Sequence, residues 1–120
     1  MTTDRSARLL GGLLLAAGAA HFAVPKPFDA IVPRGLPGAP RTWTRASGLA
    51  ELAVGAAVLH PRGRRVGALA AAGLFTAVFP ANVQMAYDWR HRPAPLRAAA
   101  FARLPLQAPL ILWALRVSRH

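Results

Sequence analysis

The chain contains no cysteine, and this absence excludes several chemistries at once. Without a thiol the protein has no disulfide framework, no cysteine nucleophile and no cysteine-ligated zinc or iron–sulfur site. A redox role would therefore require a cofactor held by other side chains, or a partner that carries one.

Acidic residues are scarce: Asp and Glu number 4 against 15 Lys and Arg, which gives a formal net charge of +11. In a soluble protein this excess would suggest nucleic acid. Here most of the arginines lie in short stretches between apolar segments, where basic residues flank membrane spans and meet anionic headgroups. No nucleic-acid-binding pattern accompanies them. We therefore expect a lipid bilayer as the partner, and no nucleic acid.

The longest stretch without a charged side chain is residues 66–87. A helix of this length crosses the ~30 Å hydrocarbon core of a bilayer, because each residue adds ~1.5 Å. Strands in soluble cores are far shorter, and a soluble helix would normally show a polar face. We predict a transmembrane helix here.

Apolar segments of similar character occur elsewhere in the chain. The four predicted spans are 7–25, 43–60, 66–87 and 98–116. The first also fits a cleaved signal peptide, with Ala17-Gly18-Ala19 as the cleavage site, but its apolar character continues beyond that tripeptide. The short basic link between the second and third spans requires antiparallel neighbours. The expected fold is an all-α membrane protein, a four-transmembrane-helix up-down bundle in one domain covering 1–120.

Proline predicts where these helices stop or bend. Five prolines between Pro25 and Pro40 preclude a long helix there, so we expect an extramembrane loop with a short turn at 28–32. Pro80 lies inside the third span, where it predicts a kink and frees the carbonyl of Thr76. A freed carbonyl in lipid needs a partner, so this part of the helix should face the bundle interior.

Polar side chains inside the spans all fall in one half of the membrane if the four helices alternate in direction. These residues are His21, Glu51, Asn82, Arg103 and Gln107, and Ser47 shares a helix face with Glu51. We therefore predict an interior polar cluster beneath the first loop, which joins the first and second spans, and the third loop, which joins the third and fourth spans. A charge at the centre of a span costs ~2.5–3.5 kcal/mol on insertion scales. We accordingly expect Glu51 and Arg103 to face each other as a charge-assisted pair.

Three interpretations of this cluster stay open. It fixes the register of the bundle as a structural lock, or it forms a ligand site that binds and protonates a quinone-type carbonyl or holds an anionic headgroup. The third is a proton or ion path, for which a second buried acid is missing. One His and one Glu are too few ligands for a metal. No nucleophile with its base is present, so we assign no catalytic residue.

The same residues give the chain a family resemblance. The stretches concerned are His21-Phe22 with Pro25, Phe28 and Ile31-Val32-Pro33; Ser47-Gly48 with Glu51 and Gly55; Phe79-Pro80-Ala81-Asn82 with Met85-Ala86; and Arg103-Leu104-Pro105-Leu106-Gln107 followed by Trp113-Ala114. In these the chain resembles the DoxX-like family of small four-helix membrane proteins. The resemblance implies a bacterial integral membrane protein associated with redox systems, such as a quinone-linked thiosulfate oxidation subunit or a methylamine-utilisation accessory protein.

The functional expectation combines the cluster with this resemblance. We expect a redox-associated accessory subunit that binds a quinone-type or other lipophilic ligand, has no independent enzymatic activity and serves a membrane or redox partner protein. The alternative is a non-enzymatic assembly protein whose polar cluster is purely structural. The two tails and the link between the second and third spans together hold as many Lys and Arg residues as the other two loops do. The positive-inside rule therefore gives no orientation. The dense basic link at 61–65 favours cytoplasmic termini in a bacterial cell membrane.

Overall fold

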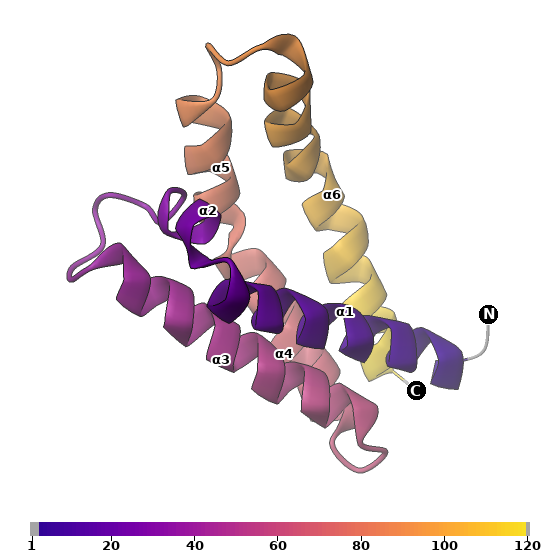
Figure 1. The fold of residues 1–120 in the computed structure, drawn as a ribbon. Helices are drawn as coiled ribbons and strands as arrows, with labels where there is room; N and C mark the ends of the chain where they lie inside the picture. The colour runs from indigo at the N-terminus through magenta and orange to yellow at the C-terminus, as the bar shows by residue number, and fades with distance from the viewer. Residues whose placement is uncertain (1–2, 120) are drawn as a thin grey trace.

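The computed structural model describes residues 3–119, and all of the regular structure in this range is helical (Figure 1). The helices are α1 (Thr3–Ala23), α2 (Pro25–Asp29), α3 (Pro40–Leu59), α4 (Arg64–Ala77), α5 (Phe79–Asp88) and α6 (Ala94–Ser118). The prediction of an all-α protein is confirmed for this range. Residues 1–2 and 120 of the expected domain lie outside the described residues.

Proline sets several of the helix ends. Val24 precedes Pro25 and has φ −135° and ψ 68°, outside the helical region, because a proline ring disfavours helical geometry in the residue before it. Pro40 then opens α3, and Pro93 caps α6. The turn expected at 28–32 is instead the short helix α2, which begins at Pro25.

The third predicted span is divided in two. α4 and α5 together cover 64–88, and the helix is interrupted at Val78. The kink predicted at Pro80 is therefore a break that lies two residues before the proline. Backbone N–H groups at the junction bond to the carbonyls of Leu74 and Thr76. The Thr76 carbonyl, which we expected Pro80 to leave free, therefore has a partner.

The long helices form two pairs, and the regular up-down bundle is not confirmed. α1 packs along α3, α4 packs along α6, and contacts between α3 and α4 join the pairs. Figure 1 shows the α1–α3 pair lying across the other, with α5 and α6 joined by the loop that connects them.

Glycine allows the closest of these helix contacts. Gly18 faces Gly48, and Gly11 faces Gly55, as α1 and α3 run antiparallel. A Cβ atom added to Gly18 would lie 2.8 Å from the carbonyl oxygen of Gly48, and one added to Gly55 would lie 3.0 Å from that of Gly11. Backbone oxygens cannot move aside as a flexible side chain can, so both positions need a residue without Cβ.

The main hydrophobic core lies at the end of the molecule that holds both termini (Figure 1). It is built largely from small side chains: Ala7, Leu10, Leu14, Val58, Ala68, Ala71, Ala72, Phe75, Ala114 and Val117. Two polar contacts secure this end. The Trp113 indole donates to the Ser6 hydroxyl at 2.7 Å, and Arg64 approaches Asp4 at 3.3 Å.

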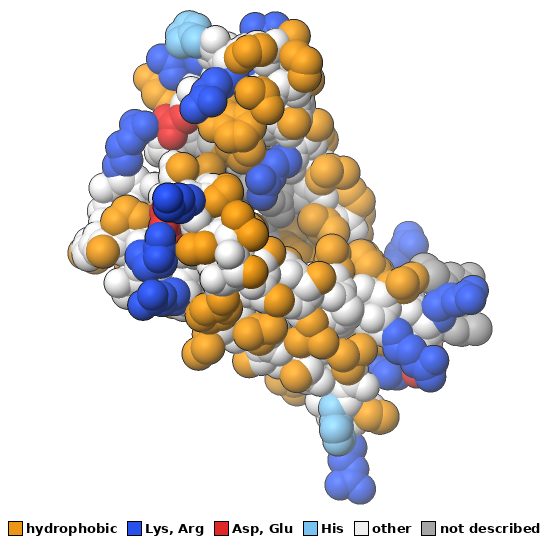
Figure 2. Space-filling model, viewed as in Figure 1, with side chains coloured by type: hydrophobic (Ala, Val, Ile, Leu, Met, Phe, Trp, Pro, Cys, Tyr) orange, Lys and Arg blue, Asp and Glu red, His pale blue; other side chains and the backbone are white. Residues whose placement is uncertain are grey.

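Three helical segments are long and apolar enough to cross a membrane: Asp4–Ala23, Arg64–Asp88 and Ala94–Ser118. α3 matches the predicted span 43–60 in position but is not among them, since Arg41, Arg45 and Glu51 lie along it. Figure 2 shows Lys and Arg gathered toward the ends of the molecule, with a largely apolar surface between them. That distribution suits a bilayer, in which charge stays near the headgroups.

Candidate functional site

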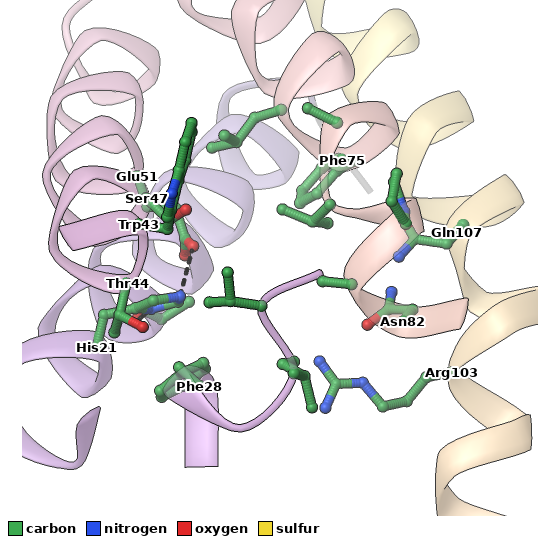
Figure 3. A pocket seen from close by; sticks show the side chains of 18 of the residues that line it. His21, Phe28, Trp43, Thr44, Ser47, Glu51, Phe75, Asn82, Arg103 and Gln107 are labelled. Atoms are coloured by element: carbon green, nitrogen blue, oxygen red, sulfur yellow. Dashed lines mark hydrogen bonds and ion pairs between the residues drawn. The ribbon is translucent and has the colours of Figure 1, made fainter. Parts of the chain in front are cut away.

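A cavity of about 700 Å³ lies between the two helix pairs. All of the predicted cluster residues line it, namely His21, Ser47, Glu51, Asn82, Arg103 and Gln107, and so does Pro80. Figure 2 shows the surface hollowed between α2 and α6. In Figure 3 the side chains from α1 and α3 form one wall, and those from α5 and α6 face them from the other.

His21 and Glu51 form a dyad on the first wall. The His21 Nδ1 atom lies 2.6 Å from the Ala17 carbonyl oxygen. A carbonyl can only accept, so Nδ1 carries a proton. Nε2 lies 3.4 Å from the Glu51 carboxylate, and both side chains are about nine-tenths buried. A neutral imidazole with this tautomer would turn a lone pair toward an ionised carboxylate, so one proton must lie on Nε2 or on Glu51. In either case the dyad has no net charge.

The floor of the cavity beside this dyad is α2. The ring of Phe28 stacks on His21, with centroids 3.8 Å apart and planes 20° from parallel. Residues after α2 then cross the cavity, where Ile31, Val32 and Leu36 line it. An ion pair of 2.6 Å between Arg34 and Asp88 attaches this segment to the end of α5.

Asp29, at the end of α2, fastens this floor to α3. The Thr44 hydroxyl donates to Asp29 Oδ1 at 2.6 Å, and Arg41 Nε donates to Oδ2 at 2.8 Å. These two contacts stabilise the ionised carboxylate and hold the pKa of Asp29 below its ordinary value, the Thr44 hydrogen bond contributing most.

The predicted pair of Glu51 with Arg103 is wrong. Glu51 meets His21, and the Arg103 guanidinium instead contacts the Met85 sulfur at 3.2 Å. The close glycine contact between α1 and α3 brings His21 to Glu51, whereas Arg103 lies on α6 across the cavity (Figure 3). Both charged side chains line the same cavity without reaching each other.

Two amide side chains on the second wall are buried and have no partner among the described residues. Asn82 is 4% exposed and Gln107 is 6% exposed. The Gln107 Oε1 atom is buried without a hydrogen bond. A buried polar atom left unpaired costs ~1–3 kcal/mol, so folding alone gives no reason for the position of the Gln107 Oε1 atom.

Sequence reasoning missed several residues of the site. Thr44 could have been predicted, because Thr44, Ser47 and Glu51 follow the helical spacing of one face. Phe28 and Met85 were not, since each depends on how separate helices pack against each other. Among residues 3–119 no three His, Asp or Glu side chains lie close enough to hold a metal ion.

Fold and site together define a helical protein with several segments long and apolar enough to span a membrane, and with a mixed polar and apolar cavity between its helix pairs. Residues 10–118 match the family described as a domain of unknown function, DUF8561. The match covers most of the chain, which therefore belongs to this family. No curated protein and no solved structure matches the chain.

Proposed function

We propose that this protein is a multi-pass membrane protein that binds a lipophilic ligand, of quinone type or similar, in the cavity between its helix pairs. In this proposal it serves a redox complex as an accessory subunit and has no independent enzymatic activity. The redox association comes from the resemblance to the DoxX-like family; the binding role rests on the cavity.

The binding role rests on one observation: a largely apolar cavity is lined by polar side chains, some of which have no hydrogen-bond partner within residues 3–119. Ligand sites are typically clefts of roughly 300–1,000 Å³ lined by apolar side chains with a few polar groups that fix orientation. The cavity has this size, and Asn82 and Gln107 line it without a hydrogen-bond partner among the described residues. A ligand carbonyl would accept from the amide N–H groups of Asn82 and Gln107 and from Arg103, whereas the unpaired Gln107 Oε1 atom is itself an acceptor and would need a donor group of the ligand. The opposite dyad holds a proton within the same cavity.

In the proposed arrangement α3 crosses the membrane with the other segments. Its acid is neutralised by His21, and its glycines pack on α1, so α3 presents less polarity to lipid than its composition suggests. The termini then lie in the cytoplasm of a bacterial cell, and the cavity lies in the outer half of the bilayer.

A structural role for the cluster is the second candidate, and the His21–Glu51 contact favours it. Interhelical polar contacts in membranes contribute about 0.6 kcal/mol each and fix helix register. Such a lock would have its polar groups paired with one another. The buried Gln107 Oε1 atom on the second wall, which has no hydrogen bond within the described part of the chain, is what this candidate does not explain.

The test is native extraction into lipid particles, followed by mass spectrometry of lipophilic molecules that remain bound. The wild type is compared with Ala17→Phe, which places a ring in the cavity, and with Ala16→Phe, which adds the same ring to an exposed position on α1. We expect a stoichiometric ligand in the wild type and in Ala16→Phe, and its loss from Ala17→Phe. If none of the three retains a ligand, the structural role is preferred.

A further inference from the structure

We propose that the ligand in this cavity is an anionic amphiphile. Its carboxylate or phosphate group pairs with Arg103, and its hydrocarbon part fills the apolar remainder. This inference rests on the proposed function, because it concerns the same cavity and names the chemistry of what the cavity holds.

Arg103 has no acidic side chain as a partner within residues 3–119. The sequence contains only 4 acidic residues, and each already faces a basic side chain other than Arg103. Asp4 contacts Arg8 and Arg64, Asp29 contacts Arg41, Glu51 contacts His21, and Asp88 contacts Arg34. No acid is left for Arg103. Since the His21–Glu51 dyad is neutral in either protonation state, the cavity as a whole carries one uncompensated positive charge.

The charge of Arg103 also lies in an apolar part of the chain. Arg103 is half-buried on α6, within a segment apolar enough to cross a membrane. The neighbour that its guanidinium contacts is the Met85 sulfur, a weak acceptor that carries no charge. An isolated arginine in such a segment is unfavourable, and it is normally found paired or facing a polar cavity. An anion bound in the cavity would supply the missing partner.

The donors around Arg103 suit an anion in particular. A guanidinium offers parallel N–H groups that match both oxygens of a carboxylate or two oxygens of a phosphate. Asn82 and Gln107 line the same wall, and their amides have N–H groups to offer (Figure 3). A neutral carbonyl would accept hydrogen bonds here but would leave the charge uncompensated.

The rest of the cavity suits hydrocarbon. Its lining includes Leu13, Leu14, Phe75, Leu106 and Leu110. A charged headgroup at Arg103 with an acyl chain among these side chains would satisfy both parts of the cavity. Two sources share this chemistry: a free fatty acid and an anionic phospholipid of the surrounding bilayer.

The experiment uses the full chain in detergent and native mass spectrometry to count bound ligands. The probes are oleate, its uncharged methyl ester, phosphatidylglycerol, and a neutral alkyl benzoquinone. The comparison of oleate with its ester needs no variant and so does not depend on how a substituted protein folds. We expect an anionic probe to bind one per chain, about tenfold to a hundredfold more tightly than the ester.

Variants then assign the effect to one residue. Arg103→Gln should remove the preference for the anion, and Arg103→Lys should keep a part of it. Arg97→Gln changes an exposed arginine of the same helix, outside the cavity lining, and should have no effect.

The outcomes separate this inference from the proposed function. Tight oleate binding identifies a fatty acid, whereas co-purified phosphatidylglycerol that oleate does not displace identifies a membrane lipid; both support the inference. If the benzoquinone and the ester bind as tightly as oleate, the inference is overturned and the proposed function stands. If no probe binds stoichiometrically to the folded wild type, both are overturned.

Discussion

His21 shows how much one imidazole ring can determine at the residue scale. Its Nδ1 atom is fixed by the Ala17 carbonyl, its ring is covered by Phe28, and its Nε2 atom is left facing Glu51. The backbone contact decides the tautomer, and the tautomer requires that the dyad hold a proton. Because of these constraints, the protonation of His21 and that of Glu51 depend on each other.

Removing either member of the dyad should have unequal effects. Glu51→Gln keeps an N–H donor beside Nε2, so we expect a loss of about 1 kcal/mol in the free energy of unfolding. His21→Ala leaves a buried acid without its partner, so we expect a loss of about 3 kcal/mol or more. The double variant should lose less than the sum, with a coupling of about 1–3 kcal/mol. Denaturant unfolding in detergent measures all four proteins, and strict additivity would show that the residues do not interact.

Asp29 should give the fold a dependence on acid pH. The folded-state pKa of Asp29 is lowered, so its contacts with Thr44 and Arg41 stabilise the fold at any pH above the unfolded-state pKa of about 3.9. That stabilisation is lost as the pH falls from there through the lower folded-state pKa. The melting temperature of the wild type should exceed that of Asp29→Asn at pH 6, and the difference should shrink as the pH falls below about 3.9. Because the other acids titrate in both proteins, a difference that persists unchanged at acid pH would contradict the assignment.

At the scale of elements, the contact between α1 and α3 depends on glycine. Gly18→Ala would put a methyl group 2.8 Å from the Gly48 carbonyl oxygen, and overpacking of this kind typically costs about 1–3 kcal/mol. Gly12 lies on the same helix with open space at its Cβ position. Gly12→Ala should therefore be neutral or stabilise the helix by up to about 1 kcal/mol. Thermal unfolding of the two variants measures this contrast, and equal melting temperatures would mean that the helices are not in close contact.

The helices themselves could be predicted from the sequence to within a few residues, because apolar runs and prolines act locally. Their partners could not. Spacing places Arg103 on a helix face and Glu51 on another, but which faces meet depends on how closely the helices approach. Glycines in α1 and α3 let these two helices pack closely, and this packing places His21 beside Glu51. That the polar residues of the predicted cluster would lie at one level of the molecule could be predicted, because the level of each residue follows from its position on a helix and from the direction of that helix. Membership of a DoxX-like family stays a prediction.

At the scale of the whole molecule, one end is tightly packed and the other is open. The core of small side chains, the Ser6–Trp113 hydrogen bond and the Asp4–Arg64 contact lie at one end. The end beside the third loop has a smaller core of Ile31, Met85 and Ala100. Local stability follows the density of such buried contacts.

Amide hydrogen exchange should report this difference. We expect amides of α4 and of the last turns of α6 to exchange about tenfold or more slowly than those of α5 and the first turns of α6. Adding a ligand should slow exchange most in α5, because Pro80, Ala81 and Asn82 of this less protected helix line the cavity. Uniform exchange along α6 would contradict the division of the molecule into a packed and an open end.

The pairing of α3 with α1 also has a consequence for biosynthesis. α3 is the long helix that is not apolar enough to be counted as a span by itself, yet its glycines and its acid find their partners on α1. In the proposed membrane arrangement α1 leaves the ribosome first, so the surface that shields Glu51 would already be in the bilayer when α3 emerges. Insertion of α3 should therefore be conditional on α1. A glycosylation reporter placed in the 61–65 link would detect this, since His21→Leu together with Gly18→Leu should leave α3 outside the membrane. The order of the helices in the chain then determines the order in which they can insert.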